Sequence, residues 1–438
     1  MLRNTSAPRF RYLRFSLGTL SVFIAATSAC LGWLAFERSG AQARRELARS
    51  LDDKGLRYGV SFSPSGLYPH AAPPWPLRLL GDKSPEYGDS VIVSGHSPPQ
   101  TADGVLARMA PLTQLHSISL SEQITDAGVA SLAAFPGLRD LDFVGGLVTD
   151  AGFARLGTTA SLESLEIRGR SHEISLALGA AVSHLANLRS LELGDRGADP
   201  WNRRTPIAPG ALAGLPGLQR LQYLGLGGTE ATDRDLRYVA AIPRLRSLVV
   251  RCTLITDTGL EALASNTSIE RITLCFTLAD DAGMRSLGRL GNLTDIDLSE
   301  TRVGDAGLAE LAGLTNVKWL NLSGTRITDA ALATISKFTK LERLDLSCTE
   351  VTDPGLAQLS QLKSLLDLNL ASTRITDAAL AHLRTLTALS VLNISCEGVT
   401  DAAAASTRAA LPRCQVQHVQ VFRSHFGPRR WDGMGGGF

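Results

Sequence analysis

The chain has 438 residues, a formal net charge of +2 and only 5% aromatic residues. A chain of this length ordinarily predicts two or three domains. Residues 1–57 carry 10 basic and 4 acidic side chains, whereas residues 88–421 carry 29 basic and 35 acidic ones. The basic first segment suits a membrane surface, and the acidic remainder argues against nucleic acid as a partner, because that binding needs a basic face.

An uncharged apolar run follows the amino terminus. Residues 1–14 form a basic tail with four arginines, and residues 15–36, FSLGTLSVFIAATSACLGWLAF, contain no charged side chain. A helix needs ~20 apolar residues to cross a bilayer. We therefore expect a transmembrane helix over residues 15–36 that anchors the chain in the membrane.

Two other interpretations of this run remain open. A cleavable signal peptide also has an arginine-rich start and small residues, here near Ala29. The sequence TSAC resembles a lipoprotein signal ending at Cys30, which would make the protein an extracytoplasmic lipoprotein, although Thr27 stands where an apolar residue is usual. Four arginines lie on each side of the run, so the charge balance does not fix its orientation. Because a short leading tail usually stays in the cytoplasm, we expect a single-pass protein with its repeats outside the cytoplasm, in the periplasm.

Residues 37–87 form the next segment. The stretch ARRELARSLDDKGL predicts a short surface helix, and YPHAAPPWPLRLL predicts a proline-rich connector. At the other end of the chain, residues 422–438 are rich in glycine and predict a disordered tail.

A 24-residue period dominates the sequence between these segments. Asp126 and Asp150 are separated by this interval, and a longer series of aspartates repeats it without interruption. This series consists of Asp233, Asp257, Asp281, Asp305, Asp329, Asp353, Asp377 and Asp401. A fixed period of this size predicts a solenoid.

One period, LERLDLSCTEVTDPGLAQLSQL, shows the elements of the unit. Leu344 and Leu346 are two residues apart and share one face of a short strand. Asp353 is placed to cap a short helix, with Pro354 at the first helical position. The three leucines of GLAQLSQL are spaced by three residues and predict the buried side of that helix.

The unit L-x-x-L-x-L-x-x-T-x-[IV]-T-D-x-[GA]-L-x-x-L resembles a leucine-rich repeat, close to the cysteine-containing class. Threonine, from Thr253 to Thr373, stands where that class has asparagine or cysteine. Its hydroxyl can satisfy backbone groups of the turn as asparagine does. Together with the single apolar span, the start RYLRFSLGTL and the sequence PWPLRLLGD also resemble bacterial membrane-anchored repeat proteins of the planctomycete type.

The resemblance implies an α/β fold over residues 88–421. It would be a right-handed solenoid of about 12 repeats with a parallel sheet on the concave face, short helices on the convex face, and caps near Val91–Val93 and Val416. The expected strands start at Leu115, Leu138, Leu162, Leu188, Leu221, Leu245, Ile269, Leu293, Val317, Leu341, Leu365 and Leu389.

Residues beside the strand leucines would then line the concave face. The first half carries an acidic stripe of Asp140, Asp142, Glu166 and Glu192. The middle carries Tyr223, Arg271, Asp295, Asp297, Trp319, Asn321, Arg343 and Asp345. Because tryptophan, tyrosine and arginine dominate binding energy at interfaces, we expect a protein partner on this middle patch. The alternative is that a concave sheet face carries polar residues without binding anything.

An insertion interrupts the period. The spacing from Leu188 to Leu221 is 33 residues, and the extra residues fall within GDRGADPWNRRTPIAPG. Insertions in repeat arrays map to loops on one face and are often binding elements. Trp201, Arg203 and Arg204 are therefore candidate partner contacts, and a tolerated surface insertion is the alternative.

No motif of a nucleotide-binding loop, a zinc protease or a serine hydrolase occurs. Helix capping explains the aspartate series better than metal binding does. Cys348 and Cys396 lie two repeats, ~10 Å, apart, which is too far for a disulfide, and we expect the cysteines after Cys30 to be unpaired. We therefore predict no catalytic, cofactor-binding or metal-binding residues and no small-molecule substrate.

The expected function is that of a membrane-anchored, non-catalytic leucine-rich-repeat module that binds a protein partner on its concave face. A soluble adaptor of the F-box type for a ubiquitin ligase is an alternative, although no F-box-like helical segment precedes the repeats. An enzyme assembled across repeats is a third possibility, for which only Cys275 approaches the concave face.

Overall fold

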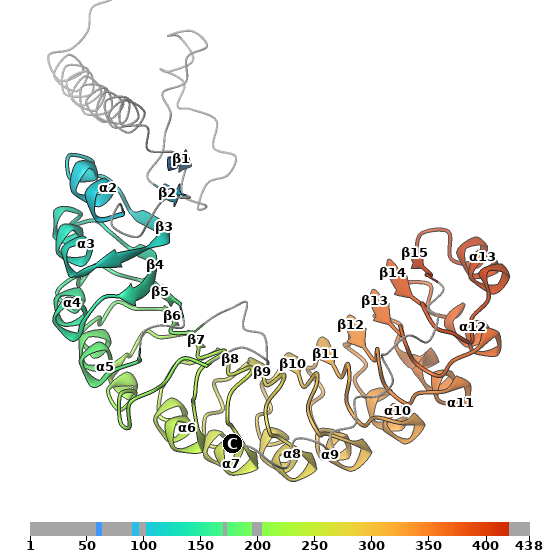
Figure 1. Ribbon diagram of the computed structural model, residues 1–438. Helices are drawn as coiled ribbons and strands as arrows, with labels where there is room; N and C mark the ends of the chain where they lie inside the picture. Colours follow the sequence, from blue (N-terminus) through green and yellow to red (C-terminus); the bar gives the residue numbers. More distant parts are fainter. Residues whose placement is uncertain (1–57, 64–89, 96–101, 170–172, 195–203, 420–438) are drawn as a thin grey trace, which may run out of the picture.

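The computed structural model describes residues 58–63, 90–95, 102–169, 173–194 and 204–419. In this part of the chain, one sheet runs along the inside of an arc and the helices cover its outside (Figure 1). The sheet has 15 strands in sequence order. β1 pairs with β2 in the antiparallel sense, and every later strand pairs in parallel with the one before it.

Most strands contain three residues, and those of the first repeats are longer. Their bounds are β1 Tyr58–Ser63, β2 Ser90–Gly95, β3 Ser117–Thr125, β4 Asp140–Leu147, β5 Ser164–Arg168, β6 Ser190–Glu192, β7 Tyr223–Gly225, β8 Ser247–Val249, β9 Arg271–Thr273, β10 Asp295–Asp297, β11 Trp319–Asn321, β12 Arg343–Asp345, β13 Asp367–Asn369, β14 Val391–Asn393 and β15 Gln415–Gln417.

The helices of the outer side are equally short. The α-helices are α2 Ala102–Met109, α3 Asp126–Ser131, α4 Asp150–Leu156, α5 Leu176–Ser183, α6 Asp233–Ala240, α7 Asp257–Leu263, α8 Asp281–Leu287, α9 Asp305–Glu310, α10 Asp329–Ile335, α11 Asp353–Leu356, α12 Leu380–Leu383 and α13 Asp401–Ala410. Four 3₁₀ turns complete them: η2 Leu132–Ala134, η3 Leu215–Gly217, η4 Ala357–Gln361 and η5 Asp377–Ala379.

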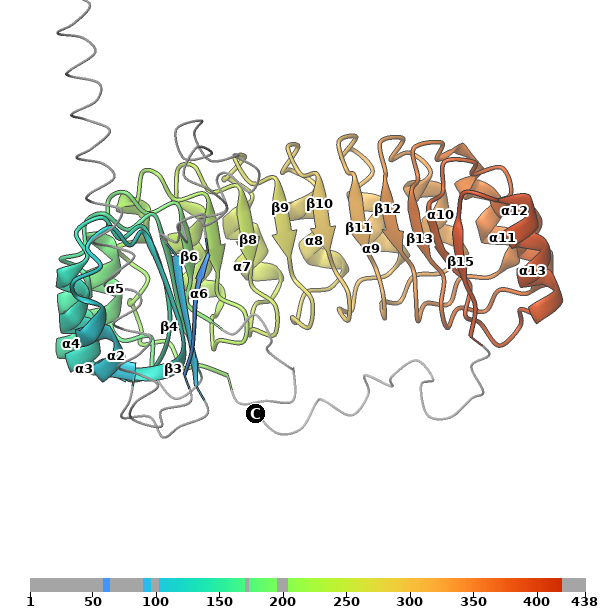
Figure 2. The same cartoon turned by 90° about the horizontal axis from the view of Figure 1, so that it is seen from above.

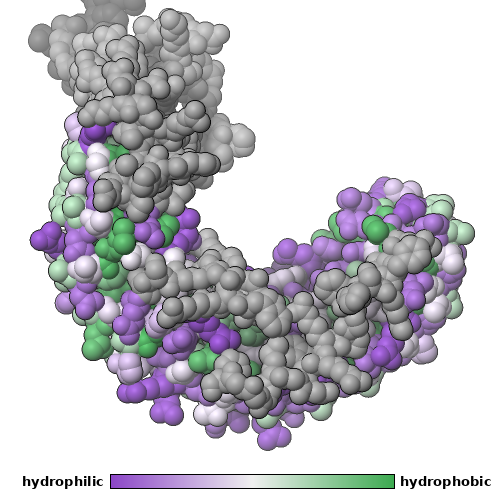
Figure 3. Space-filling view, viewed as in Figure 1, coloured by the Kyte–Doolittle hydropathy of each residue, from purple (hydrophilic) through white to green (hydrophobic). Residues whose placement is uncertain are grey.

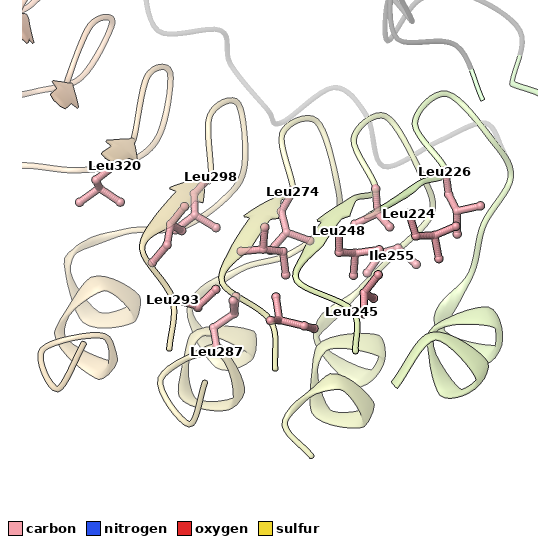
Figure 4. Packing of buried hydrophobic residues seen from close by; sticks show 14 of the residues in the cluster. Leu224, Leu226, Leu245, Leu248, Ile255, Leu274, Leu287, Leu293, Leu298 and Leu320 are labelled. Carbon is pink, nitrogen blue, oxygen red and sulfur yellow. The ribbon is translucent and has the colours of Figure 1, made fainter. Parts of the chain in front are cut away.

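Each three-residue strand buries its central side chain and turns the flanking ones to the concave side. In β11, Leu320 is buried between the partly exposed Trp319 and Asn321. Leu320 is in register with Ile296 on one side and Leu344 on the other. Buried side chains therefore stack from repeat to repeat between strands and helices (Figure 4), and a single core cluster extends along the whole arc.

Buried threonines close the turn after each strand of the regular repeats. Thr349 donates its hydroxyl to the carbonyl oxygen of Leu346 at 2.6 Å. The same bond recurs at Thr229, Thr253, Thr277, Thr301, Thr325 and Thr373. The expectation that threonine satisfies turn backbone groups is confirmed.

The aspartate series links neighbouring repeats, which corrects its expected role. The N-cap of α11 is Thr352, and Asp353 is the first helical residue, so Pro354 stands one position later than expected. The carboxylate of Asp353 instead reaches the next repeat, where it accepts from the backbone N–H of Thr376 at 2.7 Å and from its hydroxyl at 2.6 Å. We call this arrangement the Asp–Thr ladder. It recurs from Asp103 onward, as at Asp126, Asp233, Asp305, Asp329 and Asp377.

The sheet begins earlier than residue 88, because β1 lies within the segment that the sequence assigned to helix and connector. The twelve expected strands are present as β3–β14, and the expected end units contain β2 and β15. The predicted basic tail 1–14, transmembrane helix 15–36 and tail 422–438 lie outside the described residues. Among the helices of the described ranges, none has the length and apolar character needed to cross a bilayer.

Candidate partner-binding surface

The concave surface consists of side chains in columns that cross the parallel strands, which Figure 2 shows side by side. The first column precedes the buried central residue of each strand and contains Arg271, Asp295, Trp319, Arg343 and Asp367. The second column follows it and contains Asp297, Asn321, Asp345, Asn369 and Asn393. The third column lies two residues further on and contains Arg251, Cys275, Ser299, Ser323, Ser347 and Ser395.

Trp319 lies at the centre of the first column. Its register partners are Asp295 on β10 and Arg343 on β12, as the repeat spacing predicted. The tryptophan is partly buried, whereas Arg343 is exposed and Arg271 projects from β9. The Asp295 carboxylate accepts a hydrogen bond from the hydroxyl of Thr294 at 2.6 Å. The structure therefore places an indole between an acidic and a basic side chain.

The second column has a structural duty at the end of each strand. Asp297 accepts from the backbone N–H of Ser299 at 3.0 Å, and Asn321 accepts from that of Ser323 at the same distance. The same bond forms at Asp345, Asn369 and Asn393. Aspartate and asparagine thus alternate in one hydrogen-bonding role, which the sequence interpretation of Asp297 and Asn321 as partner contacts had not included.

Burial perturbs the carboxyl groups of this region. Burial raises the pKa of Asp297, with a further contribution from the negative charge of Asp345, while hydrogen bonds from Ser299 oppose the increase. Burial and the charge of Asp345 also raise the pKa of Asp367, and Arg343 offsets part of that effect. Within the described residues, none of these three aspartates forms an ion pair. The C-terminal half of the concave face therefore carries uncompensated negative charge.

The acidic stripe of the N-terminal half is compensated within the protein. Arg168 on β5 binds both oxygens of Asp142 on β4, at 2.5 and 2.8 Å, and donates to the carbonyl oxygen of Leu120 at 3.1 Å. Ser119 donates to the same carboxylate at 2.8 Å. Sequence reasoning missed Arg168, although an arginine where later repeats have serine was a visible signal.

Tyr223 does not join the patch around Trp319. It lies on β7, and β8 separates it from Arg271 on β9. Its hydroxyl donates to Glu192, which is buried, at 2.5 Å. The predicted group of partner-binding residues is therefore divided between two places, with Tyr223 on the N-terminal side.

The insertion is described from Arg204 onward, and Trp201 and Arg203 lie outside the described residues. Arg204 donates to the carbonyl oxygen of Cys252 at 2.9 Å. Thr205 forms a parallel bridge with Thr229. Arg204 is thus engaged with the turn of a later repeat, which gives it a structural contact.

Polar pairs line the edge where the strands begin. A depression of about 360 Å³ is bounded by Glu270, Asn292, Thr294, Asn316, Lys318 and Lys340. Lys318 pairs with Glu342 at 3.3 Å, and Lys340 donates to Asn316 at 2.8 Å. On the opposite edge, Arg374 pairs with Glu350 at 3.1 Å, so the expected charge ladder includes this contact.

The cysteines of the described residues are free, as expected. Cys275 is buried on the concave side, and burial together with the charge of Asp297 raises the pKa of its thiol to about 12. At neutral pH this group is a thiol, which is a poor nucleophile.

Two further residues of the concave surface escaped the sequence analysis. Asp367 occupies the first column one repeat after Arg343, so continuing the 24-residue register would have found it. Arg251 occupies the third column and its side chain lies against Gly227, where an added Cβ would be 3.1 Å from the arginine Cγ.

Comparisons with known proteins agree with this architecture. The family described as Leucine Rich repeat matches residues 243–264, 292–312 and 339–360. An internalin (InlF) from Listeria monocytogenes has a similar structure, with a TM-score of 0.55 and 20% identity over 79% of this chain and 93% of its own. A leucine-rich-repeat protein from Leptospira interrogans matches with a TM-score of 0.42 and 16% identity over 71% of this chain and 86% of its own. No curated protein matches the sequence.

The period, the buried strand leucines and the family match define the class: the chain is a leucine-rich-repeat protein. Its repeats form a solenoid in which strands line the concave side and short helices the convex side (Figure 1).

Proposed function

We propose that this protein is a non-catalytic binding module that holds a protein partner on the concave surface around β10–β13. The observation that carries the proposal is Trp319. It is a large side chain at a position where the fold needs none, since it faces away from the core and lies between Asp295 and Arg343. An apolar anchor beside charged groups is typical of residues that dominate binding energy.

Replacing Trp319 with alanine tests this proposal. The full-length protein and its Trp319→Ala variant would be used to capture partners side by side, with Arg285→Ala as the control. Arg285 lies on the convex helix α8 and its side chain is 72% exposed. We expect a partner that is retained by the wild type and the control, and whose affinity falls by ~2 kcal/mol or more in Trp319→Ala. A partner retained equally by all three proteins would exclude this surface.

The absence of catalysis is part of the proposal. The raised pKa of Cys275, about 12, keeps the one thiol of the third column protonated at neutral pH. The hydrogen bonds of Asp297 and Asn321 end strands and do not orient a nucleophile. These features support a binding surface more strongly than an active site assembled across the repeats.

The proposal also includes a membrane anchor at residues 15–36, with the repeats in the periplasm. Its support is the uncharged run of 22 residues between Arg14 and Glu37. The full-length protein should remain with membranes after alkaline carbonate washing. Protease added to intact spheroplasts should then digest the repeats, and full protection of the repeats would reverse the orientation.

A further inference from the structure

The concave surface carries more negative charge than its hydrogen bonds require. In the second column, Asn321, Asn369 and Asn393 accept the backbone N–H two residues later, at 3.0, 3.1 and 3.1 Å. Asp297 and Asp345 make the same bond at 3.0 and 2.8 Å. Since a neutral amide does this work in three repeats, the ionised carboxylates in the other two serve no additional need of the strand ends.

The charge also carries an energetic cost. Asp297 is only 9% exposed, and burial is the first cause of its raised pKa. The charge of Asp345 raises the pKa of Asp297 on one side and of Asp367 on the other. Like charges held together in a partly buried place disfavour the ionised state. An external cation would relieve both the burial cost and the mutual repulsion.

Apolar recognition has little material elsewhere on the surface. The large apolar side chains that are exposed among the described residues are Leu147, Leu176, Leu278, Leu366 and Val419, which belong to separate repeats. The outer curve shows hydrophilic and hydrophobic residues interspersed (Figure 3). A partner of matching charge therefore fits this molecule better than a partner with a broad apolar face.

We propose that the surface around Trp319 receives a lysine- or arginine-rich segment of a protein partner, whose cations lie against Asp297, Asp345 and Asp367. The inference rests on the proposed function and specifies its partner. Trp319 supplies an apolar and aromatic face for the aliphatic stems or cationic heads of the same segment. Arg343 and Arg271 in the first column exclude a uniformly basic surface and favour a segment with acidic residues beside its basic ones.

The test uses the full-length chain and labelled peptides. A fluorescein-labelled glycine–serine peptide with lysines at alternate positions would be compared by fluorescence anisotropy with matched glutamine and glutamate peptides. We expect the lysine peptide to bind most tightly and its affinity to weaken with added salt. The variant D297N/D345N/D367N should bind it on the order of tenfold more weakly, the loss expected from three partly exposed charge contacts.

A control variant removes the same charge from other places. Glu230, Glu261 and Glu310 are exposed and lie outside the three columns, so E230Q/E261Q/E310Q should bind the lysine peptide as the wild type does. Equal losses in both triple variants would show a general effect of net charge and overturn the proposal. Equal binding of the lysine and glutamine peptides would overturn it as well.

Two further arms keep the result decisive. Because Asn369 donates to Asp345 at 2.9 Å, the triple variant can lose stability, and D297N/D367N then replaces it. The segment after residue 419 contains Arg423, Arg429 and Arg430. If changing them to glutamine increased peptide affinity about tenfold, the chain's own tail would be the occupant, and the proposal of a partner segment would be wrong. A captured partner lost by Trp319→Ala but retained by D297N/D345N/D367N would preserve the proposed function and overturn only this inference.

Discussion

The two halves of the concave sheet treat similar acidic side chains differently. On β4, Asp142 is held by both guanidinium contacts of Arg168 and by Ser119. On β13, Asp367 has only the neighbouring charge of Arg343 to offset its burial and the charge of Asp345. A carboxylate in a strand column is therefore not evidence of binding by itself. Whether its charge is compensated inside the protein decides between a structural and a functional interpretation.

The halves also differ in the turns that follow their strands. From β7 onward, the residue before the buried threonine has positive φ, and it is a residue other than glycine at Cys252, Phe276, Glu300, Cys348 and Ser372. Gly228 and Gly324 occupy the same position, where they avoid the steric cost that a side chain incurs in this region. In β4, the strand itself continues to Leu147. The regular repeats thus have one turn geometry, and variation there is confined to side chains.

The largest expected effect tests whether the core distinguishes the halves. Leu165 on β5 and Leu344 on β12 are 0% and 2% exposed. Changing either to aspartate buries an unpaired charge and should reduce the free energy of unfolding by several kcal/mol in both cases. Urea unfolding followed by circular dichroism measures this. An unchanged midpoint for one of the two variants would mean that the halves do not share one core.

A smaller effect should separate the halves. Arg168→Ala removes the bonds to Asp142 and Leu120 and should cost ~1–3 kcal/mol, because a partly buried carboxylate loses its cation. Arg343→Ala removes an exposed side chain and should change stability by less than ~0.5 kcal/mol. The comparison fails if both variants shift the urea midpoint equally.

The Asp–Thr ladder should contribute similarly in both halves. Thr149→Val and Thr352→Val each remove a hydroxyl bonded to the preceding repeat's aspartate, at 2.6 and 2.5 Å, and should each cost ~1 kcal/mol.

The ladder also predicts a pH dependence. Hydrogen bonds from Thr149 lower the pKa of Asp126 below its ordinary 3.8. The stabilisation from this group is therefore present above pH 3.8 and is lost as the pH falls through the lower folded-state pKa. Acid unfolding of Thr149→Val should show a smaller loss in that range than the wild type does.

The smallest effect has the opposite sign. Asp367→Asn removes a charge that the fold disfavours, and should stabilise the protein at neutral pH by a few tenths of a kcal/mol after solvent screening. Because the folded-state pKa is raised, the wild type recovers the difference as the pH falls through that value and the carboxyl group becomes protonated. Thermal unfolding at neutral and acidic pH checks both statements. Destabilisation at neutral pH would show that Asp367 has a structural partner.

Sequence patterns predicted the repeating part of this fold well, for a physical reason. A buried leucine every 24 residues can be satisfied only by the equivalent residue of the next repeat, so the period fixes strand order and register. It also predicted that Trp319 lies between Asp295 and Arg343. β1 escaped prediction because an antiparallel strand outside the repeat has no periodic signal, and the segment 37–87 was interpreted from its proline content instead.

The roles of individual polar residues were harder to predict. Sequence position places Asp142 and Asp297 in the same column, but only the structure shows that Arg168 reaches one and that Ser299 binds the other. Such contacts depend on rotamers and on side chains one or two strands away. The periodic aspartates were expected to cap their own helices, and their reach into the next repeat depends on the distance between helix starts.

The Asp–Thr ladder makes the length of this molecule adjustable in whole units. Deleting residues 329–352 would join Thr328 to Asp353, so that Asp305 still meets Thr328 and Asp353 still meets Thr376. At the far end, the last aspartate, Asp401, lies 3.3 Å from His418 where a further threonine would otherwise be. Gain or loss of a repeat during evolution would therefore leave every junction chemically complete, while changing which side chains face one another across the arc.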